Sequence, residues 1–493
     1  MKKQIKVSMT IAATMLAMAG VAQAAPAELN IYGASAQYLY WNANAKAFAE
    51  SLGCTATAPV NNGGKHGFVS ATNCTSTLVP QNAANGNKRD LDIRYSGIAS
   101  AEGPLAVRRQ LPLDPAYNNG CSVAGQRLMY ASGTTLTCKQ VHIGTSDVAG
   151  ESLVQSSTGA KFGPAPFDRS TPPKPNTAAT YNVSLPAAGI STAGLTPANT
   201  VVVPFGFFAN KNVKARSCTT GLVGSYCTAD HQCDTIFPGT TTDAITGVVT
   251  INAGDGVCNP TATTIDNISR EEANIIFSGY AANWKDLGDY FTDQAVVACL
   301  RHAGSGTHSA LDLTVMNSGW GSNVTTAQTD GAIYFNAGST DEIRCINGAT
   351  TATPDGSLMG GIGYADADQA VGVVKNGVSD IDNGNVVALK YNGVYPTRAA
   401  IRNGLYDFYT DAWMYTNPLN GSVGQTVKTV NDIAAMLIAF AQNPANIPLS
   451  KANYWATTAE MKFNRAADTT YPAQTPDPLT CGATGTGACY QLP

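Results

Sequence analysis

Short apolar runs alternate along this chain with stretches of helical periodicity. The first run, residues 29–33, predicts a strand that enters a glycine turn, and Tyr38, Trp41, Ala45 and Phe48 follow at the spacing of one helix face. Repetition of strand, small-residue turn and helix is typical of an α/β protein, in which ligands bind beyond the carboxyl ends of the strands. The same patterns predict further strands at 91–98, 141–144, 201–208, 296–300 and 359–364, and further helices at 273–277, 309–316 and 430–442.

One helix start carries a specific signal. Ser269 is followed three residues later by Glu272, immediately before the apolar stretch 273–277. This spacing predicts a capping box, in which each side chain accepts a hydrogen bond from the other residue's backbone N–H.

Four long polar stretches interrupt the periodic segments. Loops of such length without secondary structure are uncommon inside compact domains. We therefore expect insertions on a smaller α/β core, at residues 54–86, 104–138, 156–200 and 217–259.

The N-terminus has the pattern of a secretory signal peptide. Lys2, Lys3 and Lys6 precede the apolar run 7–21, and the small-x-small sequence at 22–24 is a cleavage site. The run is short for a membrane span, so we expect no membrane insertion. Residues 1–24 are predicted to be removed, which places the mature protein in the periplasm or outside the cell.

Twelve cysteines follow the signal peptide. An even number in an exported chain favours disulfides. Metal ligation is the alternative, but no Cys-x-x-Cys pair occurs in the sequence and the spacing suits zinc poorly. Spacing does not determine connectivity. We expect pairing between neighbours along the chain, and a bond between Cys299 and Cys345 would brace the segment that leads to Arg301.

Charge is sparse. The 493 residues carry a formal net charge of −4, and 13% of them are charged, about half the usual share. This composition offers no broad basic field for nucleic acid and no polybasic patch for a membrane surface. The length is sufficient for two domains of ordinary size.

The residues Arg301 to Thr307 are the strongest chemical signal. They join a fixed cation to a Gly-Ser-Gly-Thr turn, and the helical stretch 309–316 follows. Backbone N–H groups at a helix start, two hydroxyls and a guanidinium suit an oxyanion. Taken alone, the turn is equally typical of an ordinary loop or helix cap.

Seven motifs, in order, resemble the phosphate-binding proteins of bacterial ABC phosphate transporters. The loop at 301–307 is similar to that family's Arg-x-Asp-Gly-Ser-Gly-Thr, and the segment 143–147 to its Phe-Gly-Ala-Ser-Asp. The resemblance spans about two thirds of the mature chain and leaves out the cysteine-bearing insertions and the tail after Asn464. The other motifs are 31–38, 95–100, 276–284, 361–364 and 395–396.

The resemblance implies a two-lobed fold of the periplasmic binding-protein type, with two α/β lobes joined by crossing strands and an oxyanion in the cleft between them. A hinge motion would close the cleft. The expected division is a signal peptide at 1–24, a first lobe at 25–208, a second lobe at 209–390, and a return to the first lobe with a tail at 391–493.

The resemblance also implies the ligand and its contacts. The ligand would be inorganic phosphate or a related oxyanion, an ABC permease is compatible as partner, and no cofactor, metal or catalytic residue is implied. Asp147 would accept a proton of the anion, which phosphate and arsenate carry at neutral pH and sulfate does not. The implied ligand-binding residues are Gln37, Tyr38, Ser100, Asp147, Arg301, Ser305, Gly306 and Thr307.

Three positions depart from the family pattern. Gln37 stands where the family has Thr, and Tyr38 where it has Phe. Ala303 stands where the family has the Asp between the Arg and the Gly-Ser-Gly-Thr turn. An arginine without an orienting carboxylate is less preorganised, so Ala303 predicts weaker or less selective anion binding.

Two other function classes were weighed. Ser, His and Asp side chains cluster at 302–312, as in hydrolases, but the sequence lacks the Gly-x-Ser-x-Gly pattern, so we expect no enzyme. The second class is a secreted or cell-surface structural or interaction protein that reuses the fold with weak or no phosphate binding. The insertions and the sparse charge favour this alternative.

Overall fold

The protein is described by a computed structural model. It covers residues 26–61, 65–82, 85–113, 121–131, 135–162, 175–235, 239–242, 245–246, 249–252, 254–316, 332–348, 359–372, 384–420, 426–469 and 472–474. The predicted signal peptide, Cys481 and Cys489 lie outside these ranges. Within them, no helix combines the length and the apolar character needed to cross a bilayer.

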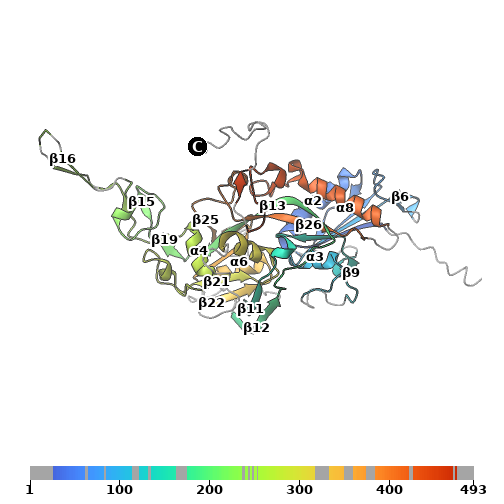
Figure 1. Cartoon of the computed structure of the whole chain (residues 1–493), viewed down its shortest axis with the longest axis horizontal. Coiled ribbons are helices and arrows are strands. Elements are labelled where there is room, and N and C mark those ends of the chain that lie inside the picture. Colours follow the sequence, from blue (N-terminus) through green and yellow to red (C-terminus); the bar gives the residue numbers. More distant parts are fainter. Residues whose placement is uncertain are drawn as a thin grey trace, which may run out of the picture.

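One mixed sheet of 15 strands runs through the molecule (Figure 1). Three strands lie off its main path: β24 (Val386–Ala388) and β27 (Ala456–Thr457) pair with β13, and β3 (Val60–Asn61) pairs with β4. The others are, in order across the sheet, β12 (Pro175–Ser184), β11 (Ser156–Phe162), β22 (Ala332–Asn336), β21 (Val297–Arg301), β23 (Gly361–Asp366), β13 (Thr196–Asn210), β26 (Tyr409–Thr416), β10 (Ile143–Ser146), β1 (Ala27–Gly33), β7 (Leu91–Gly97), β4 (His66–Thr72) and β2 (Thr55–Ala56).

Two parallel groups of strands form two lobes. In one, β1 pairs in parallel with β7 and β10, and in the other, β21 pairs in parallel with β22 and β23. The long strand β13 belongs to both, because its first part pairs with β26 and its second part, from Phe205 to Ala209, pairs with β23. The predicted α/β fold of two lobes joined by crossing strands is therefore confirmed.

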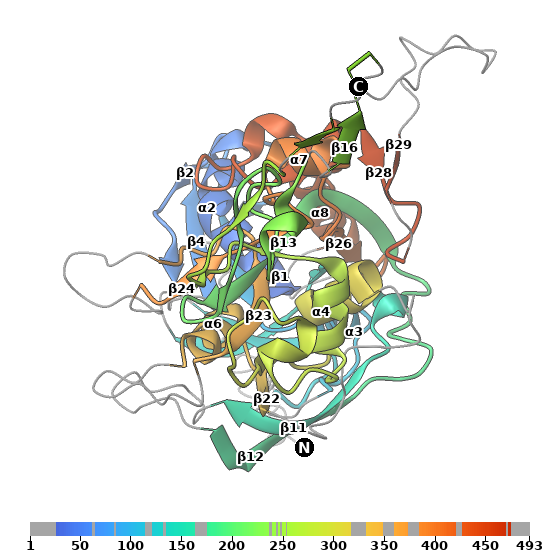
Figure 2. The same ribbon diagram turned by 90° about the vertical axis from the view of Figure 1, so that its left-hand side faces the viewer.

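Helices cover both lobes. Figure 2 shows α2 and α8 in one half of the molecule and α4 and α6 in the other. The predicted capping box starts α4, where Glu272 N–H donates to Ser269 Oγ at 3.1 Å and Ser269 N–H donates to Glu272 Oε2 at 2.8 Å. The helices are α2 (Ser35–Ser51), α3 (Glu102–Val107), α4 (Arg270–Phe277), α5 (Gly306–Ala310) with the π-helix η6 (Leu311–Met316), α6 (Ser339–Asn347), α7 (Arg398–Arg402) and α8 (Val427–Gln442).

The segment after residue 391 contributes one long helix to the fold. Helix α8 contacts β1, β13 and β26, which belong to the first lobe or cross from it. The hairpin β11–β12 lies within the range 25–208, which was expected to form the first lobe, but it pairs with the second. Its strand β11 pairs with β22 of the second lobe, with Lys161 opposite Phe335, and so covers an edge that β22 would otherwise leave open.

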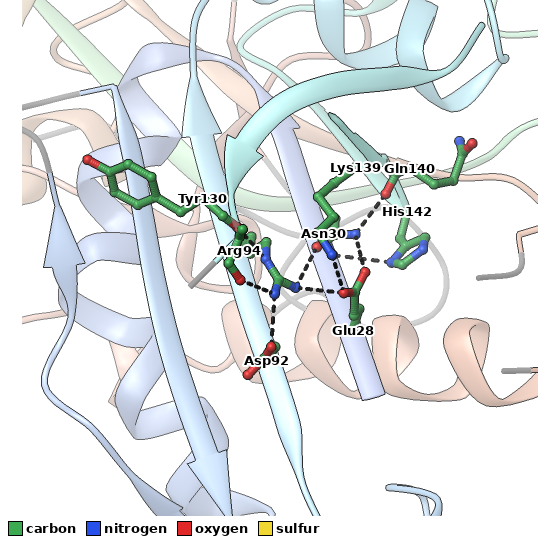
Figure 3. Close-up of polar contacts among 9 residues, drawn as sticks. Glu28, Asn30, Asp92, Arg94, Tyr130, Lys139, Gln140 and His142 are labelled. Carbon is green, nitrogen blue, oxygen red and sulfur yellow. Dashed lines mark hydrogen bonds and ion pairs between the residues drawn. The ribbon is translucent and has the colours of Figure 1, made fainter. Parts of the chain in front are cut away.

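A second hairpin is attached to the first lobe by buried polar contacts (Figure 3). It consists of β8 (Gln126–Tyr130) and β9 (Leu136–Gln140). Arg94, on β7, donates to the Tyr130 carbonyl and to Asp92 Oδ2 at 2.8 Å, and it lies 3.4 Å from Glu28 Oε1. His142 Nδ1 accepts from Asn30 N–H at 3.2 Å. The neutral imidazole is thus part of the joint between hairpin and sheet.

Five disulfides link the cysteines of the described residues. Cys54–Cys74, Cys121–Cys138 and Cys299–Cys345 join neighbours along the chain, as predicted. Pairing of neighbours is wrong for the other four cysteines, which form Cys218–Cys233 and Cys227–Cys258. All four lie in one buried cluster. In this cluster β15 (Cys218–Thr220) pairs with β18 (Val257–Cys258), which are far apart in the sequence. The disulfide partner of each cysteine is therefore not its neighbour along the chain.

The two interlaced disulfides stabilise an arm, the described part of residues 217–259. Figure 1 shows the arm extending away from the sheet, with β16 at its far end. There β16 (Gly239–Thr242) and β17 (Val249–Asn252) form a separate two-stranded sheet. The other small pairs are β5 (Gln81–Asn82) with β6 (Lys88–Arg89), β14 (Lys214–Ala215) with β19 (Thr263–Thr264), β20 (Asn267–Ile268) with β25 (Lys390–Tyr391), and β28 (Phe463–Asn464) with β29 (Ala473–Gln474).

Candidate functional site

The carboxyl ends of the parallel strands bring the predicted residues to the contact between the lobes. In the first lobe, α2 follows β1, Ser100 lies after β7, and Asp147 follows β10 directly. In the second lobe, β21 ends at Arg301 and β23 ends at Asp366. Ligand sites of open α/β sheets lie at such strand ends.

Asp147 and Ser100 form the first-lobe half of the site. The Ser100 hydroxyl donates to Asp147 Oδ2 at 3.1 Å, and Asp147 N–H lies 3.2 Å from Ser100 Oγ. Both side chains are buried. Asp147 Oδ1 is buried without a hydrogen-bond partner among the described residues. One carboxylate oxygen is therefore available to a ligand.

Gln37 and Tyr38 lie in the first turn of α2 but differ in their contacts. Gln37 Nε2 donates to the Ser146 carbonyl at 3.0 Å, next to Asp147. Tyr38 donates from its backbone N–H to the Ala34 carbonyl at 3.3 Å and from its hydroxyl to the His66 carbonyl at 3.4 Å. The structure thus places Gln37 beside Asp147, and the donors of both side chains are engaged within the chain, with Gln37 Nε2 also donating to the Trp413 carbonyl at 3.4 Å.

Arg301 is the only one of the predicted residues that brings a fixed positive charge. It is fully buried, and its Nη1 donates to Ser339 Oγ at 3.0 Å while Nη2 donates to the Ala337 carbonyl at 3.1 Å. Its Nε has no partner in the described part of the chain. The guanidinium is thus held at its two terminal nitrogens, and Nε is the one nitrogen without a partner among the described residues.

The loop after Arg301 contributes unpartnered hydroxyls. Ser305 Oγ and Thr307 Oγ1 are buried and accept or donate no hydrogen bond within the described ranges. Ala303, where the resembled family has Asp, is fully buried, and its N–H donates to Ser157 Oγ of β11 at 2.9 Å. The hairpin β11–β12 therefore holds the loop 301–307 through a hydrogen bond to its backbone.

The two halves of the site touch. The Ala101 N–H donates to the Gly304 carbonyl at 3.0 Å, which joins the lobes by a backbone hydrogen bond. Gly306 lies against Asp147 so closely that a Cβ at Gly306 would be 2.6 Å from Asp147 Cβ. The residues on both sides of this contact are buried, so the two halves of the site meet away from solvent.

Three carboxyl groups surround the single guanidinium. Burial, and then repulsion from Asp366, raise the pKa of Asp147 to about 7, although Ser100 and Arg301 oppose the shift. Burial also raises the pKa of Glu342 well above its usual range and raises that of Asp366. Arg301 stabilises the ionised form of each of the three. The pKa of each of the three carboxyl groups is therefore raised by burial and held back by the same arginine.

Glu342, Asp366 and Ser339 did not emerge from the sequence. Asp366 follows the predicted strand 359–364 by two residues, a position that could have signalled it. Ser339 and Glu342 have the spacing of a capping box. In the structure, however, Gly338 is the N-cap of α6 and makes no side-chain cap, while Glu342 Oε1 accepts from Tyr364 N–H at 3.0 Å.

The Ser, His and Asp cluster considered for a hydrolase has its side chains directed to different partners. His308 Nδ1 lies 3.0 Å from the Tyr364 hydroxyl. Ser309 Oγ donates to Gln155 Oε1 at 3.0 Å, and Gln155 Nε2 donates to Asp312 Oδ2 at 2.8 Å. These contacts tie α5 to β23 and tie α5 and η6 to the segment before β11.

No protein-family model matches the chain, and no curated protein matches it in sequence. Among solved structures, it is similar to an ABC-type phosphate transport receptor from Vibrio cholerae, with 11% identity, a TM-score of 0.36, and coverage of 83% of this chain and 93% of the receptor. A DING protein has 13% identity, a TM-score of 0.37 and coverage of 86% and 89%. A phosphate-binding protein from Stenotrophomonas maltophilia has 14% identity, a TM-score of 0.31 and coverage of 80% and 79%.

These structures include the kind of protein that the sequence motifs resemble. With identities below 25% and TM-scores below 0.5, these similarities carry no argument about the ligand or the contact residues of this chain.

Proposed function

We propose that the protein is an exported solute-binding protein that holds a protonated oxyanion, phosphate first, between Asp147 and Arg301. One observation carries this proposal. Asp147 Oδ1, Arg301 Nε, Ser305 Oγ and Thr307 Oγ1 are all buried without partners among the described residues. An unsatisfied buried polar group costs about 1–3 kcal/mol, so a cluster of four is expected to have a ligand.

The chemistry of the four atoms fits phosphate or arsenate. Arg301 and the two hydroxyls donate to oxyanion oxygens, and Asp147 accepts the proton that dibasic phosphate retains. Sulfate has no such proton at neutral pH and would face the carboxylate unpaired. Binding of this kind requires no catalytic step, and an ABC permease is the partner that such a receptor would serve in the periplasm.

Isothermal titration with phosphate, arsenate and sulfate tests the proposal. We expect micromolar or tighter binding of phosphate and arsenate. Arg301→Gln, which keeps a polar side chain but removes the guanidinium and its charge, should abolish it. Arg216→Gln is the matched control, because Arg216 lies outside the site and donates to the Asn259 carbonyl. The absence of heat with every oxyanion, in protein shown to be folded, would refute the proposal.

A second function, interaction with another macromolecule, is favoured by the arm. Its hairpin β16–β17 forms a separate two-stranded sheet at the far end (Figure 1), and isolated hairpins of this kind are at best marginally stable. In this alternative the fold is reused with weak or no phosphate binding. Replacing residues 239–252 by a short glycine-serine turn should then abolish partner capture without changing phosphate binding, whereas unchanged capture would exclude the role.

A further inference from the structure

Arg301 has an orienting partner that the loop itself does not provide. The residue two positions after it is Ala303, so no carboxylate follows the arginine in the loop. In the structure, Nη1 of Arg301 donates instead to Ser339 Oγ at 3.0 Å, and the Ser339 hydroxyl lies 3.3 Å from Asp366 Oδ2. The three side chains form a chain of hydrogen bonds from β21 through α6 to β23.

The direction of this chain follows from its protons. A guanidinium can only donate, so Ser339 Oγ must accept from Arg301. The one hydroxyl proton of Ser339 is then free to be donated to Asp366. All three residues are buried, and Gly338 rather than Ser339 is the N-cap of α6. The Ser339 hydroxyl therefore accepts its hydrogen bond from Arg301 and does not cap the N-terminus of α6.

The frame around the contact is rigid. Cys299 on β21 is bonded to Cys345 on α6, which fixes the strand that carries Arg301 to the helix that begins with Ser339. The Ala337 carbonyl holds Nη2 from the same turn. Both terminal nitrogens are thus positioned by residues 337–339, where the chain passes from β22 into α6.

We infer that Ser339, oriented by Asp366, positions Arg301 for the bound anion in place of a carboxylate in the loop. This inference rests on the proposed oxyanion function. The immediate partner of Arg301 is a neutral hydroxyl, and Arg301 has no ion pair within 4 Å among the described residues. Ser339 is a positioning residue, since it acts through Arg301.

Phosphate titration of four variants tests the inference. Ser339→Ala should weaken binding at least about tenfold, because a charge-assisted hydrogen bond that orients the guanidinium is lost. Ser339→Thr, which keeps the hydroxyl, should restore binding to within about threefold. Asp366→Asn should weaken binding less than Ser339→Ala. Thr340→Ala, at the exposed neighbouring position, is the control and should change nothing.

A double-variant cycle separates positioning from a general loss of structure. Because Arg301→Gln leaves no anion affinity to measure, the cycle is read from urea unfolding: in an Arg301→Gln background, Ser339→Ala should lower the free energy of unfolding less than it does in the wild type, since the hydrogen bond between the two side chains is already lost. An unchanged anion affinity in Ser339→Ala alone, or an equal loss of stability with and without Arg301, would overturn the inference.

A ligand-free measurement distinguishes this inference from the proposed function. The Nε–Hε NMR signal of Arg301, assigned by its loss in Arg301→Gln, should shift and broaden in Ser339→Ala but not in Thr340→Ala. If wild-type protein binds no anion and the signal still responds, the proposed function fails while the contact stands. If phosphate binds and Ser339→Ala changes neither signal nor affinity, the positioning role fails alone.

Discussion

Gly306 of the second lobe lies directly against Asp147 of the first, and a Cβ placed on Gly306 would approach Asp147 Cβ to 2.6 Å. Non-bonded carbons do not come this close. Gly306 is the first residue of α5, where its backbone conformation suits alanine as well as glycine. The missing side chain is therefore required by the contact between the lobes and not by the helix.

Gly306→Ala should prevent full closure. Alanine is a better helix former than glycine, so the separated lobes should be no less stable, while the closed state acquires a clash costing about 1–3 kcal/mol. Phosphate affinity should fall about 10–100-fold. Small-angle scattering with saturating phosphate should show a larger radius of gyration than for wild type.

Gly206→Ala provides the control for this prediction. A Cβ at Gly206 would have its nearest neighbour at 3.6 Å, an ordinary contact. Equal losses of affinity in the two variants would show that the approach of Gly306 to Asp147 has no special role.

Asp147→Asn should change which oxyanion is preferred. With a pKa of about 7, Asp147 is mostly ionised at pH 8 and accepts the proton of phosphate, whereas at pH 5.5 it is mostly protonated and can donate to sulfate. Wild-type discrimination against sulfate should therefore narrow as the pH falls. Asparagine donates at every pH, so the variant should lose more affinity for phosphate than for sulfate and show little pH dependence. Isothermal titration at both pH values checks this. Equal losses of affinity for phosphate and sulfate in Asp147→Asn would refute the proton-acceptor role.

The sequence predicted the parts of the fold and site that depend on local pattern. The strands that end at Gly33 and Arg301, the capping box at Ser269 and the helix around Ile433 follow from hydrophobic period and turn residues. Ser339 and Asp366 could not be placed, because their relation to Arg301 arises from the parallel alignment of β21, β22 and β23, which a single sequence does not specify.

The insertions were the least predictable part. The range 156–200 was expected to lie outside the core, yet its first strand extends the sheet of the second lobe and Ser157 holds the loop at Ala303. Polar residues such as Ser and Thr give β11 only a weak strand signal. Its place in the sheet depends on pairing with β22, which lies far away in the sequence. The crossed disulfides at 217–259 likewise depend on residues that are distant in the sequence and meet only in the fold.

His142→Asn should alter how stability depends on pH. Burial lowers the pKa of His142 from its ordinary value of 6.5 to about 4, so the unfolded chain takes up a proton first as the pH falls. The stability that the neutral ring provides is complete above pH 6.5 and is lost as the pH falls toward 4. The difference between wild type and His142→Asn in urea unfolding should shrink over this interval, by up to about 3 kcal/mol.

A difference in unfolding free energy between wild type and His142→Asn that stays constant from pH 7 to pH 4.5 would show that the contact of Nδ1 with Asn30 does not require a neutral ring.

Removing the Cys299–Cys345 bond should affect both stability and binding. The bond closes a segment with a sequence separation of 46 residues. Its loss in the Cys299→Ala, Cys345→Ala double variant should lower the free energy of unfolding by about 4 kcal/mol on the chain-entropy account. Phosphate affinity should fall too, because the frame that holds Ser339 against Arg301 is loosened.

The Cys121→Ala, Cys138→Ala double variant is the counterpart to this prediction. Its disulfide lies in the hairpin β8–β9 and not between elements of the site. It should destabilise the protein without changing phosphate affinity. If both double variants leave affinity unchanged, the bond between β21 and α6 has no part in positioning the arginine.

The most direct test of the central claim is anomalous diffraction from crystals grown with arsenate. The account predicts one strong arsenic peak between the two lobes, placed so that the arsenate oxygens lie within hydrogen-bond distance of Asp147 Oδ1 and Arg301 Nε, and the absence of this peak in crystals of Arg301→Gln. Well-diffracting crystals of the wild-type protein with no arsenic peak between these residues, or with a peak only elsewhere, would contradict it.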